Sequence, residues 1–306
     1  MHMKRKLYGK GDDVMGKIKR GVIYILSVVG AVIIAILVHA LLPSPGASLD
    51  TGEFDGALVQ AFGFPVVASA YFIILYLHIL LVIKCFLQKS TLSNKETGIR
   101  YGFSFGLMYL VGMQEVVVSA SPFDTYGLDF VTYQFFMGLG DTIPVLILCL
   151  LVCGIGRKKL AGENKTVKYT TKENVIASVV ITITFFTERT IGYMAGYLDS
   201  DISEYPVPVV AWTAIFGFAL SVMYLVIRPI YNNKNNVKRT IQIVVLSIGV
   251  NWIWFNCFMG LILDGLFAKM FLRSAIDVIC TTVACLVFAW IKMLKENPLN
   301  GLESKV

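Results

Sequence analysis

The chain has 306 residues, of which 56% are hydrophobic and 15% are charged, with a formal net charge of +7. A soluble domain carries about 25% charged residues, so this composition excludes an ordinary water-soluble fold. The basic residues lie in short segments beside long apolar blocks, which membrane insertion explains without a nucleic-acid partner.

The apolar residues fall into blocks long enough to cross a hydrocarbon layer of about 30 Å as helices. Barrel strands would alternate apolar and polar residues, and these blocks do not, so we expect an all-α integral membrane protein. The first block, 21–42, is longer than the apolar region of a signal peptide, which has about 7–15 residues. Seven further spans are predicted at 65–87, 101–119, 131–154, 175–198, 207–227, 240–263 and 272–294, which makes about eight in all.

The loops between these spans alternate in charge. Counting the inner helix ends, the side on which the chain starts holds 24 of the 27 lysine and arginine residues. The opposite loops hold acidic residues: Asp50, Glu53, Asp55, Asp124, Asp129, Asp199, Asp201 and Glu204. Basic loops remain in the cytoplasm. We therefore predict a multi-pass protein of the cell membrane with both termini in the cytoplasm.

The two halves of the chain share short matches in the same order. Pro65 opens the second span with Val-Val-Ala after it, and Pro208 opens the sixth span with the same three residues. Asp141 and Asp277 are each followed eight residues later by Cys-Leu, and the same offset places Glu115 opposite Asn251. These matches predict two copies of one four-helix unit, related by an axis along the membrane normal.

The repeat divides the chain into five parts. The predicted four-helix halves are 21–155 and 175–294, and a basic cytoplasmic linker, 156–174, joins them. Cytoplasmic tails, 1–20 and 295–306, flank the halves. Parallel repeats of this kind occur in transporters, whose binding sites lie near the midplane between the halves.

Several ionisable residues lie inside the predicted spans, where a charge is costly and usually faces a cavity or a partner. The candidate residues for binding a substrate or an ion are Asp141, Glu115, Glu188, Arg189, Asp277 and Asn251. Asp141 lies between two glycines and Pro144, where we expect the helix to open and its carbonyls to face a cation or proton. Arg189 is the only cation expected at this depth, paired with Glu115 or Asp141.

Other chemistry is less favoured. Cys149 and Cys153 lie on one helical face without a histidine or an acid at that depth, so no metal site is predicted. Ser104 stands in a G-x-S-x-G pattern, but that motif opens an apolar helix instead of a strand-to-helix turn. His39 and His78 are expected at different depths, which argues against haem. We predict no catalytic residues, no metal and no cofactor.

Three classes of function remain. The leading hypothesis is a small permease with an acidic intramembrane site between two four-helix halves, coupled to protons or cations. The alternative is a non-catalytic membrane sensor or assembly subunit whose buried charges only hold the helices together. A membrane-embedded enzyme is the least favoured class. The expected partners are membrane lipids and a small solute or cation, not nucleic acid, and the oligomeric state stays open.

Overall fold

The computed structural model describes residues 2–41, 54–90, 92–118, 128–156, 169–231 and 235–296. Every regular element in these ranges is a helix, so the all-α prediction is confirmed for this part of the chain. Most of the predicted linker, 157–168, lies outside the described residues, as do the end of the C-terminal tail, 297–306, and the acidic residues Asp50, Glu53 and Asp124.

The described residues of the first half form six helices. They are α1 (His2–Leu41), α2 (Ala57–Phe62), α3 (Phe64–Leu87), α4 (Asn94–Gly112), α5 (Glu115–Val118) and α6 (Leu128–Ile155). The second half contains α7 (Thr171–Ala195), α8 (Pro206–Ile227), the 3₁₀-helix η2 (Arg228–Ile230), α9 (Asn236–Ile241), the π-helix η3 (Gln242–Gly249), α10 (Val250–Ile262) and α11 (Phe267–Glu296).

Seven helical stretches of the described chain are long and apolar enough to cross a membrane. They are Ile18–Leu41, Phe64–Leu87, Phe130–Ile155, Thr171–Ala195, Pro206–Ile230, Asn236–Ile262 and Phe267–Ile291. The third predicted span corresponds to α4, which is not among them because its first two turns carry Lys95, Glu96 and Arg100. The third span, and with it the count of eight, therefore stays a prediction.

The bounds of α4 differ from those predicted for the third span, 101–119. A Ser93 cap, whose hydroxyl accepts a hydrogen bond from the amide of Glu96, starts α4 earlier, at Asn94. The helix ends at Gly112, and a turn at Met113 and Gln114 separates it from the short α5. This turn places Glu115 at the start of a new helix.

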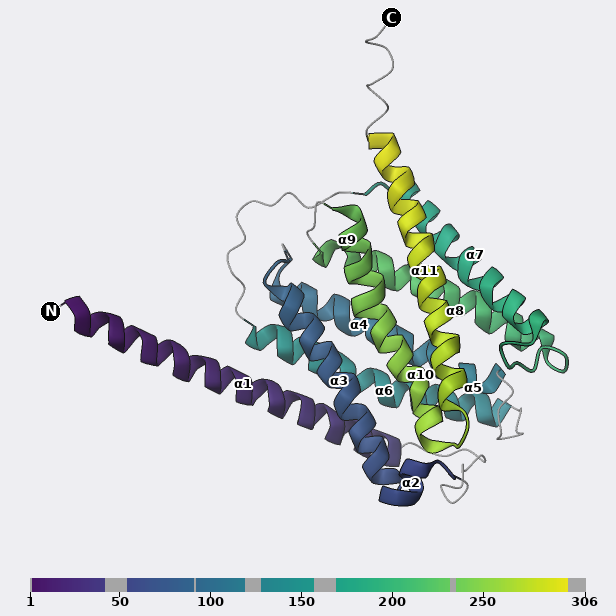
Figure 1. Ribbon diagram of the computed structural model, residues 1–306, viewed down its shortest axis with the longest axis horizontal. Helices are drawn as coiled ribbons and strands as arrows, with labels where there is room; N and C mark the ends of the chain where they lie inside the picture. The colour runs from purple at the N-terminus through teal and green to yellow at the C-terminus, as the bar shows by residue number, and fades with distance from the viewer. Residues whose placement is uncertain are drawn as a thin grey trace, which may run out of the picture.

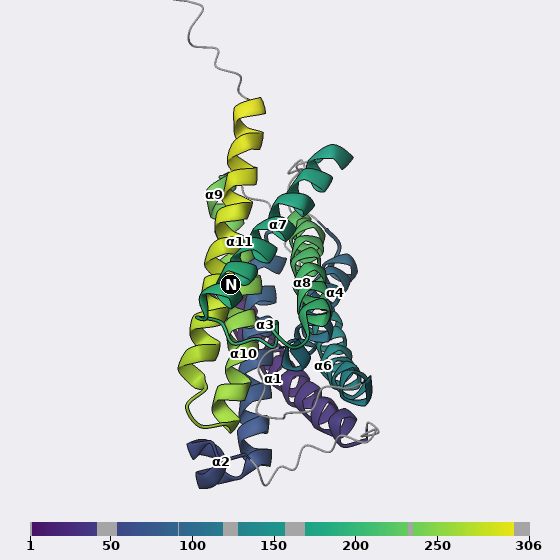
Figure 2. The ribbon, with the colours of Figure 1, turned by 90° about the vertical axis from the view of Figure 1, so that its right-hand side faces the viewer.

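The main helices form two layers (Figures 1 and 2). In one layer α4 packs between α6 and α8, and in the other α10 packs between α3 and α11. Figure 2 shows the layer of α3, α10 and α11 on the left and the layer of α4, α6 and α8 on the right. Each layer thus combines two helices from one half of the chain with one helix from the other half.

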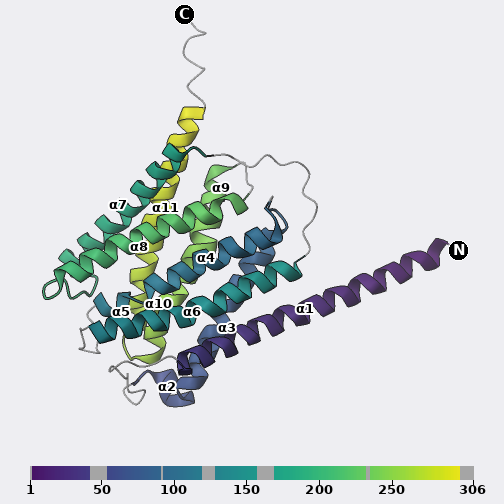
Figure 3. The same cartoon turned by 180° about the vertical axis from the view of Figure 1, so that it is seen from behind.

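The remaining long helices, α1 and α7, complete the bundle. The helix α1 packs against α3 and α6, while α7 packs against α8 and α11. The N-terminal part of α1 extends beyond the other helices (Figure 3). Because α1 begins at His2, the described part of the predicted tail 1–20 is a helical extension of the first span.

Glycines bring α4 and α6 into close contact. A Cβ added to Gly102 would lie 3.1 Å from Leu146, and one added to Gly106 would lie 2.8 Å from the methyl group of Thr142. The Thr142 hydroxyl donates to the carbonyl of Gly106, 2.9 Å away, and so joins the two helices. The G-x-S-x-G pattern of the sequence therefore serves helix packing.

Polar side chains tie the helix ends together on the basic side of the bundle. Asn94 at the start of α4 donates to the carbonyl of Gly156 after α6, over 2.7 Å. Arg100 donates to the carbonyl of Val226 near the end of α8, and Arg228 donates to Asn174 at the start of α7. These contacts bring helix ends together on one side of the bundle, as the predicted alternating topology requires. Which side is cytoplasmic stays a prediction.

Candidate functional site

Arg189 is fully buried in α7 and binds carboxylates from two other helices. Its Nε and Nη2 atoms donate to the two carboxylate oxygens of Asp277 in α11, over 2.7 and 2.6 Å. Its Nη1 atom donates to Oε1 of Glu115 in α5, over 2.5 Å. The fork geometry of a guanidinium suits this bidentate contact, which fixes α7 and α11 against each other.

Further polar groups surround this ion pair. The indole Nε1 of Trp252 donates to Oδ2 of Asp277 over 2.8 Å. Arg273 lies on α11 with its Nε atom 3.4 Å from Oε1 of Glu115, and its Nη2 atom donates to Asn256 over 3.2 Å. We refer to the five charged residues Glu115, Glu188, Arg189, Arg273 and Asp277 as the Arg189 cluster.

Aromatic rings cover the guanidinium of Arg189. Its central carbon lies 5.3 Å from the centroid of the Phe185 ring and 5.5 Å from that of the Trp212 ring. Trp212 stacks on Phe216, which in turn contacts Trp252. The rings supply cation–π attraction where the apolar surroundings weaken screening by water. The cluster is therefore built into the aromatic core of the bundle.

Glu188 is the one member of the cluster without a close ionic partner. Its carboxylate accepts no hydrogen bond, and the nearest Arg189 atom, Nε, is 4.0 Å from its Oε2. The Asp277 carboxylate acts on it both as a like charge and as a hydrogen-bond partner when one of the two groups carries a proton. Three carboxylates in the cluster face two guanidiniums, so one negative charge is unbalanced among the described residues. A buried charge of this kind needs a proton or a bound cation.

Asp141 lies apart from the Arg189 cluster and has a basic neighbour of its own. It is 3% exposed, and the Nε2 atom of His39 in α1 lies 3.5 Å from its Oδ1. The prediction that the helix opens around Asp141 is wrong, because α6 continues from Leu128 to Ile155 with Pro144 inside it. Of the two partners expected for Arg189, Glu115 or Asp141, the structure has Glu115, and the second carboxylate bound to the guanidinium is that of Asp277.

Asn251 belongs to a third group, a hydrogen-bonded chain between the halves. The hydroxyl of Tyr109 in α4 donates to Oδ1 of Asn251 over 2.6 Å. The Asn251 amide nitrogen lies 3.2 Å from Nδ1 of His78, and the Nε2 atom of His78 lies 3.0 Å from the carbonyl of Leu246 in the π-helix. A carbonyl only accepts, so His78 carries its hydrogen on Nε2 and accepts from Asn251.

The predicted site residues thus fall into three groups. The structure brings Glu115, Glu188, Arg189 and Asp277 together, and it places Asp141 and Asn251 in separate contacts. Sequence reasoning missed Arg273 as a second buried cation, because it lies near an outer loop, and it missed His39 as the neighbour of Asp141. Arg273 is in the second turn of α11 because that helix starts at Phe267, and its side chain is 6% exposed.

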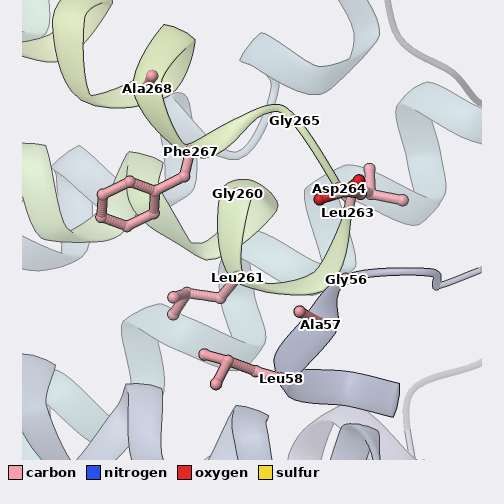
Figure 4. Close-up of a pocket in the computed structure, with 10 residues that line it drawn as sticks. All are labelled: Gly56, Ala57, Leu58, Gly260, Leu261, Leu263, Asp264, Gly265, Phe267 and Ala268. Carbon is pink, nitrogen blue, oxygen red and sulfur yellow. The ribbon is translucent and has the colours of Figure 1, made fainter. Parts of the chain in front are cut away.

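A cavity of about 360 Å³ lies at the turn between α10 and α11, beside the start of α2 (Figure 4). Its lining is mostly apolar or backbone, with Leu58, Leu261 and Phe267 around it and Asp264 as the charged residue. A second cavity, of about 340 Å³, lies at the basic end beside Arg20 and Lys84. No member of the Arg189 cluster lines either cavity.

Together the apolar helices and these buried polar groups define a multi-pass α-helical membrane protein with charged residues in its interior. No protein-family model, no curated protein and no solved structure matches the chain.

Proposed function

We propose that the protein is a small permease of the cell membrane, with an acidic site between two four-helix halves that couples transport to protons or cations. The observation that carries the proposal is the unbalanced carboxylate of Glu188 beside the paired Asp277. A purely structural ion-pair network gains nothing from an extra buried acid, whereas a coupling site requires a group that binds and releases a cation.

The packing of the helices supports the two-half architecture. The contacts of α1 with α3 and α6 correspond to those of α7 with α8 and α11, and the contact of α4 with α6 corresponds to that of α10 with α11. Between the halves, α4 packs against α8 as α10 packs against α3. A two-fold axis would exchange α1 with α7, α3 with α8, α4 with α10 and α6 with α11. This exchange turns each of these contacts into another of them.

The position of the Arg189 cluster supports a site between the halves. Glu115 comes from the first half, whereas Arg189, Arg273 and Asp277 come from the second half. A relative movement of the halves would change the distance between Glu115 and its two arginines, and so the balance of charge at Glu188. Such movement of one repeat against the other is how many transporters alternate access.

The test is a solute screen on the full chain in proteoliposomes that contain a trapped pH indicator. Amino acids, sugars, organic acids and organic cations are added outside, one at a time, under an imposed proton gradient and again under a sodium gradient. We expect at least one solute to enter in a manner that depends on one of these gradients. Absence of gradient-dependent uptake for every solute would contradict the proposal.

A sensor or assembly subunit is the second candidate function, and the bidentate contact between Arg189 and Asp277 favours it. This contact is buried, aromatic-lined and suited to fixing helices. In that case substitutions in the cluster lower stability and no solute moves. A membrane enzyme would need a base such as His78 beside Ser104. This function is less supported, because the His78 ring is already engaged with Asn251 and Leu246.

A further inference from the structure

His39 is held against α6 by the shape of both helices. A Cβ added to Gly140, the residue before Asp141, would lie 2.9 Å from Cε1 of His39 and 3.1 Å from its Nδ1. The imidazole therefore occupies the space that a side chain at position 140 would fill. On its other side the ring contacts Phe72 of α3, with 5.6 Å between the ring centroids. The location of the ring is thus defined by packing as well as by charge.

The hydrogen-bond partner of Nδ1 determines the tautomer of this ring. Nδ1 lies 2.8 Å from the backbone carbonyl of Ala35, one turn earlier in α1. A carbonyl oxygen only accepts, so Nδ1 must carry a hydrogen. In neutral imidazole the other nitrogen then has only a lone pair, and here that nitrogen, Nε2, faces Oδ1 of Asp141 at 3.5 Å.

Two acceptors would face each other if both groups lacked a proton. Oδ1 of Asp141 has no other hydrogen-bond partner, and no lysine or arginine of the described chain forms an ion pair with it. Asp141 also acts electrostatically on Tyr71 and Tyr76 of α3 and Tyr109 of α4, and Glu115 of α5 is engaged with Arg189 and Arg273. One proton, on either Nε2 or the carboxyl group, removes the conflict.

The second half of the chain contains an equivalent contact with a different base. Asp277 aligns with Asp141, and its partner Arg189 lies on α7, the counterpart of α1. An arginine is protonated at any physiological pH, whereas a histidine gains and loses its proton near neutrality. The aligned aspartate therefore faces a histidine in the first half and an arginine in the second.

We infer that His39 and Asp141 form a proton-binding site in the first half of the chain, in which the pair shares one exchangeable proton. The site is separate from the Arg189 cluster. The inference concerns protonation alone, so it holds or fails independently of whether the protein transports a solute.

The test is solid-state NMR of the wild-type full chain in lipid nanodiscs, labelled with ¹⁵N-histidine and ¹³C-aspartate. Signals of His39 and Asp141 are assigned by their absence in His39→Gln and Asp141→Asn. At neutral pH we expect a hydrogen on Nδ1 and one further proton in total on Nε2 and the carboxyl group. An unprotonated Nδ1, or an ionised carboxylate facing an unprotonated Nε2, would overturn the inference.

A pair of glycine variants tests the geometry. Gly140→Ala should displace the imidazole and remove the through-space ¹⁵N–¹³C contact between His39 and Asp141. Gly154→Ala, on the same helix, is the matched control because a Cβ there meets no atom within 4 Å, and it should keep the contact. Retention of the contact in both variants would contradict the arrangement. The wild-type measurement decides the proton count even if Gly140→Ala fails to fold.

Discussion

Arg189 and Asp277 form a bidentate ion pair between α7 and α11, with donor–acceptor distances of 2.7 and 2.6 Å. Both side chains are at most 1% exposed, so water cannot replace either partner. The indole of Trp252 donates to the same carboxylate and leaves little freedom for it to move. The pair therefore anchors the second half of the chain, and Glu115 extends the anchor to the first half.

Removing the charge of Asp277 should destabilise the protein strongly. Asp277→Asn removes the bidentate partner of the buried Arg189 guanidinium, which then keeps Glu115 at 2.5 Å and Glu188 at 4.0 Å, and breaking a buried pair costs about 3–5 kcal/mol. Unfolding in detergent, followed by circular dichroism, measures this change. Asp199→Asn is the control, because Asp199 pairs with Lys269 at the surface and exposed pairs contribute less than about 1 kcal/mol. Equal losses in the two variants would show that the buried pair does not anchor the fold.

Asp141→Asn should cost less stability than Asp277→Asn. After this substitution His39 can be neutral and accept a hydrogen bond from the new amide, so no buried charge is left unpaired. The expected loss is at most that of a hydrogen bond to a charged group, about 1.5–3 kcal/mol. The same unfolding assay checks the order of the two variants. The reverse order would mean that Asp141, not Asp277, is the main structural carboxylate.

Gly106→Ala should separate α4 from α6. The added Cβ would lie 2.8 Å from the methyl group of Thr142, and overpacking of this kind costs about 1–3 kcal/mol. Gly154→Ala provides the comparison, because it adds a methyl group in open space in the last turn of α6. The unfolding temperature should therefore fall in Gly106→Ala and stay close to that of the wild type in Gly154→Ala, and equal losses in the two variants would refute the close packing.

The orientation can be tested at the two ends of α7. Single cysteines replace Lys172 and Asp199, both exposed, in a chain without its native cysteines. If the basic side is cytoplasmic, an impermeant thiol reagent labels position 199 in intact cells and position 172 only after permeabilisation. Labelling of position 172 from outside would reverse the predicted topology.

Seven apolar helices could be predicted from the sequence because length and hydropathy depend on local composition alone. Which charged residues pair at the site could not be predicted, since pairing depends on the depth and rotation of each helix. Arg189 was expected beside Glu115, as it is, but its second partner is Asp277, from a helix 88 residues further on. Arg273 belongs to the charges near an outer loop in the sequence, and only the start of α11 shows that it is buried.

Helix irregularities were also beyond sequence reasoning. Pro144 removes one amide donor, yet α6 continues through it. The irregular backbone lies instead in the π-helix Gln242–Gly249, which contains no proline and only a terminal glycine. His78 contacts the carbonyl of Leu246 there, a contact between halves that no local pattern indicates.

The most direct test of the proposed permease is the gradient-dependent uptake of an identified solute in proteoliposomes that contain wild-type protein, Glu188→Gln or Glu96→Gln. Glu96 is a matched acid that pairs with Arg100 at the basic end of α4, outside the Arg189 cluster. The account predicts that Glu188→Gln folds and loses the dependence of uptake on the proton or sodium gradient, while Glu96→Gln behaves as the wild type. A folded Glu188→Gln variant with undiminished, gradient-dependent uptake would contradict it.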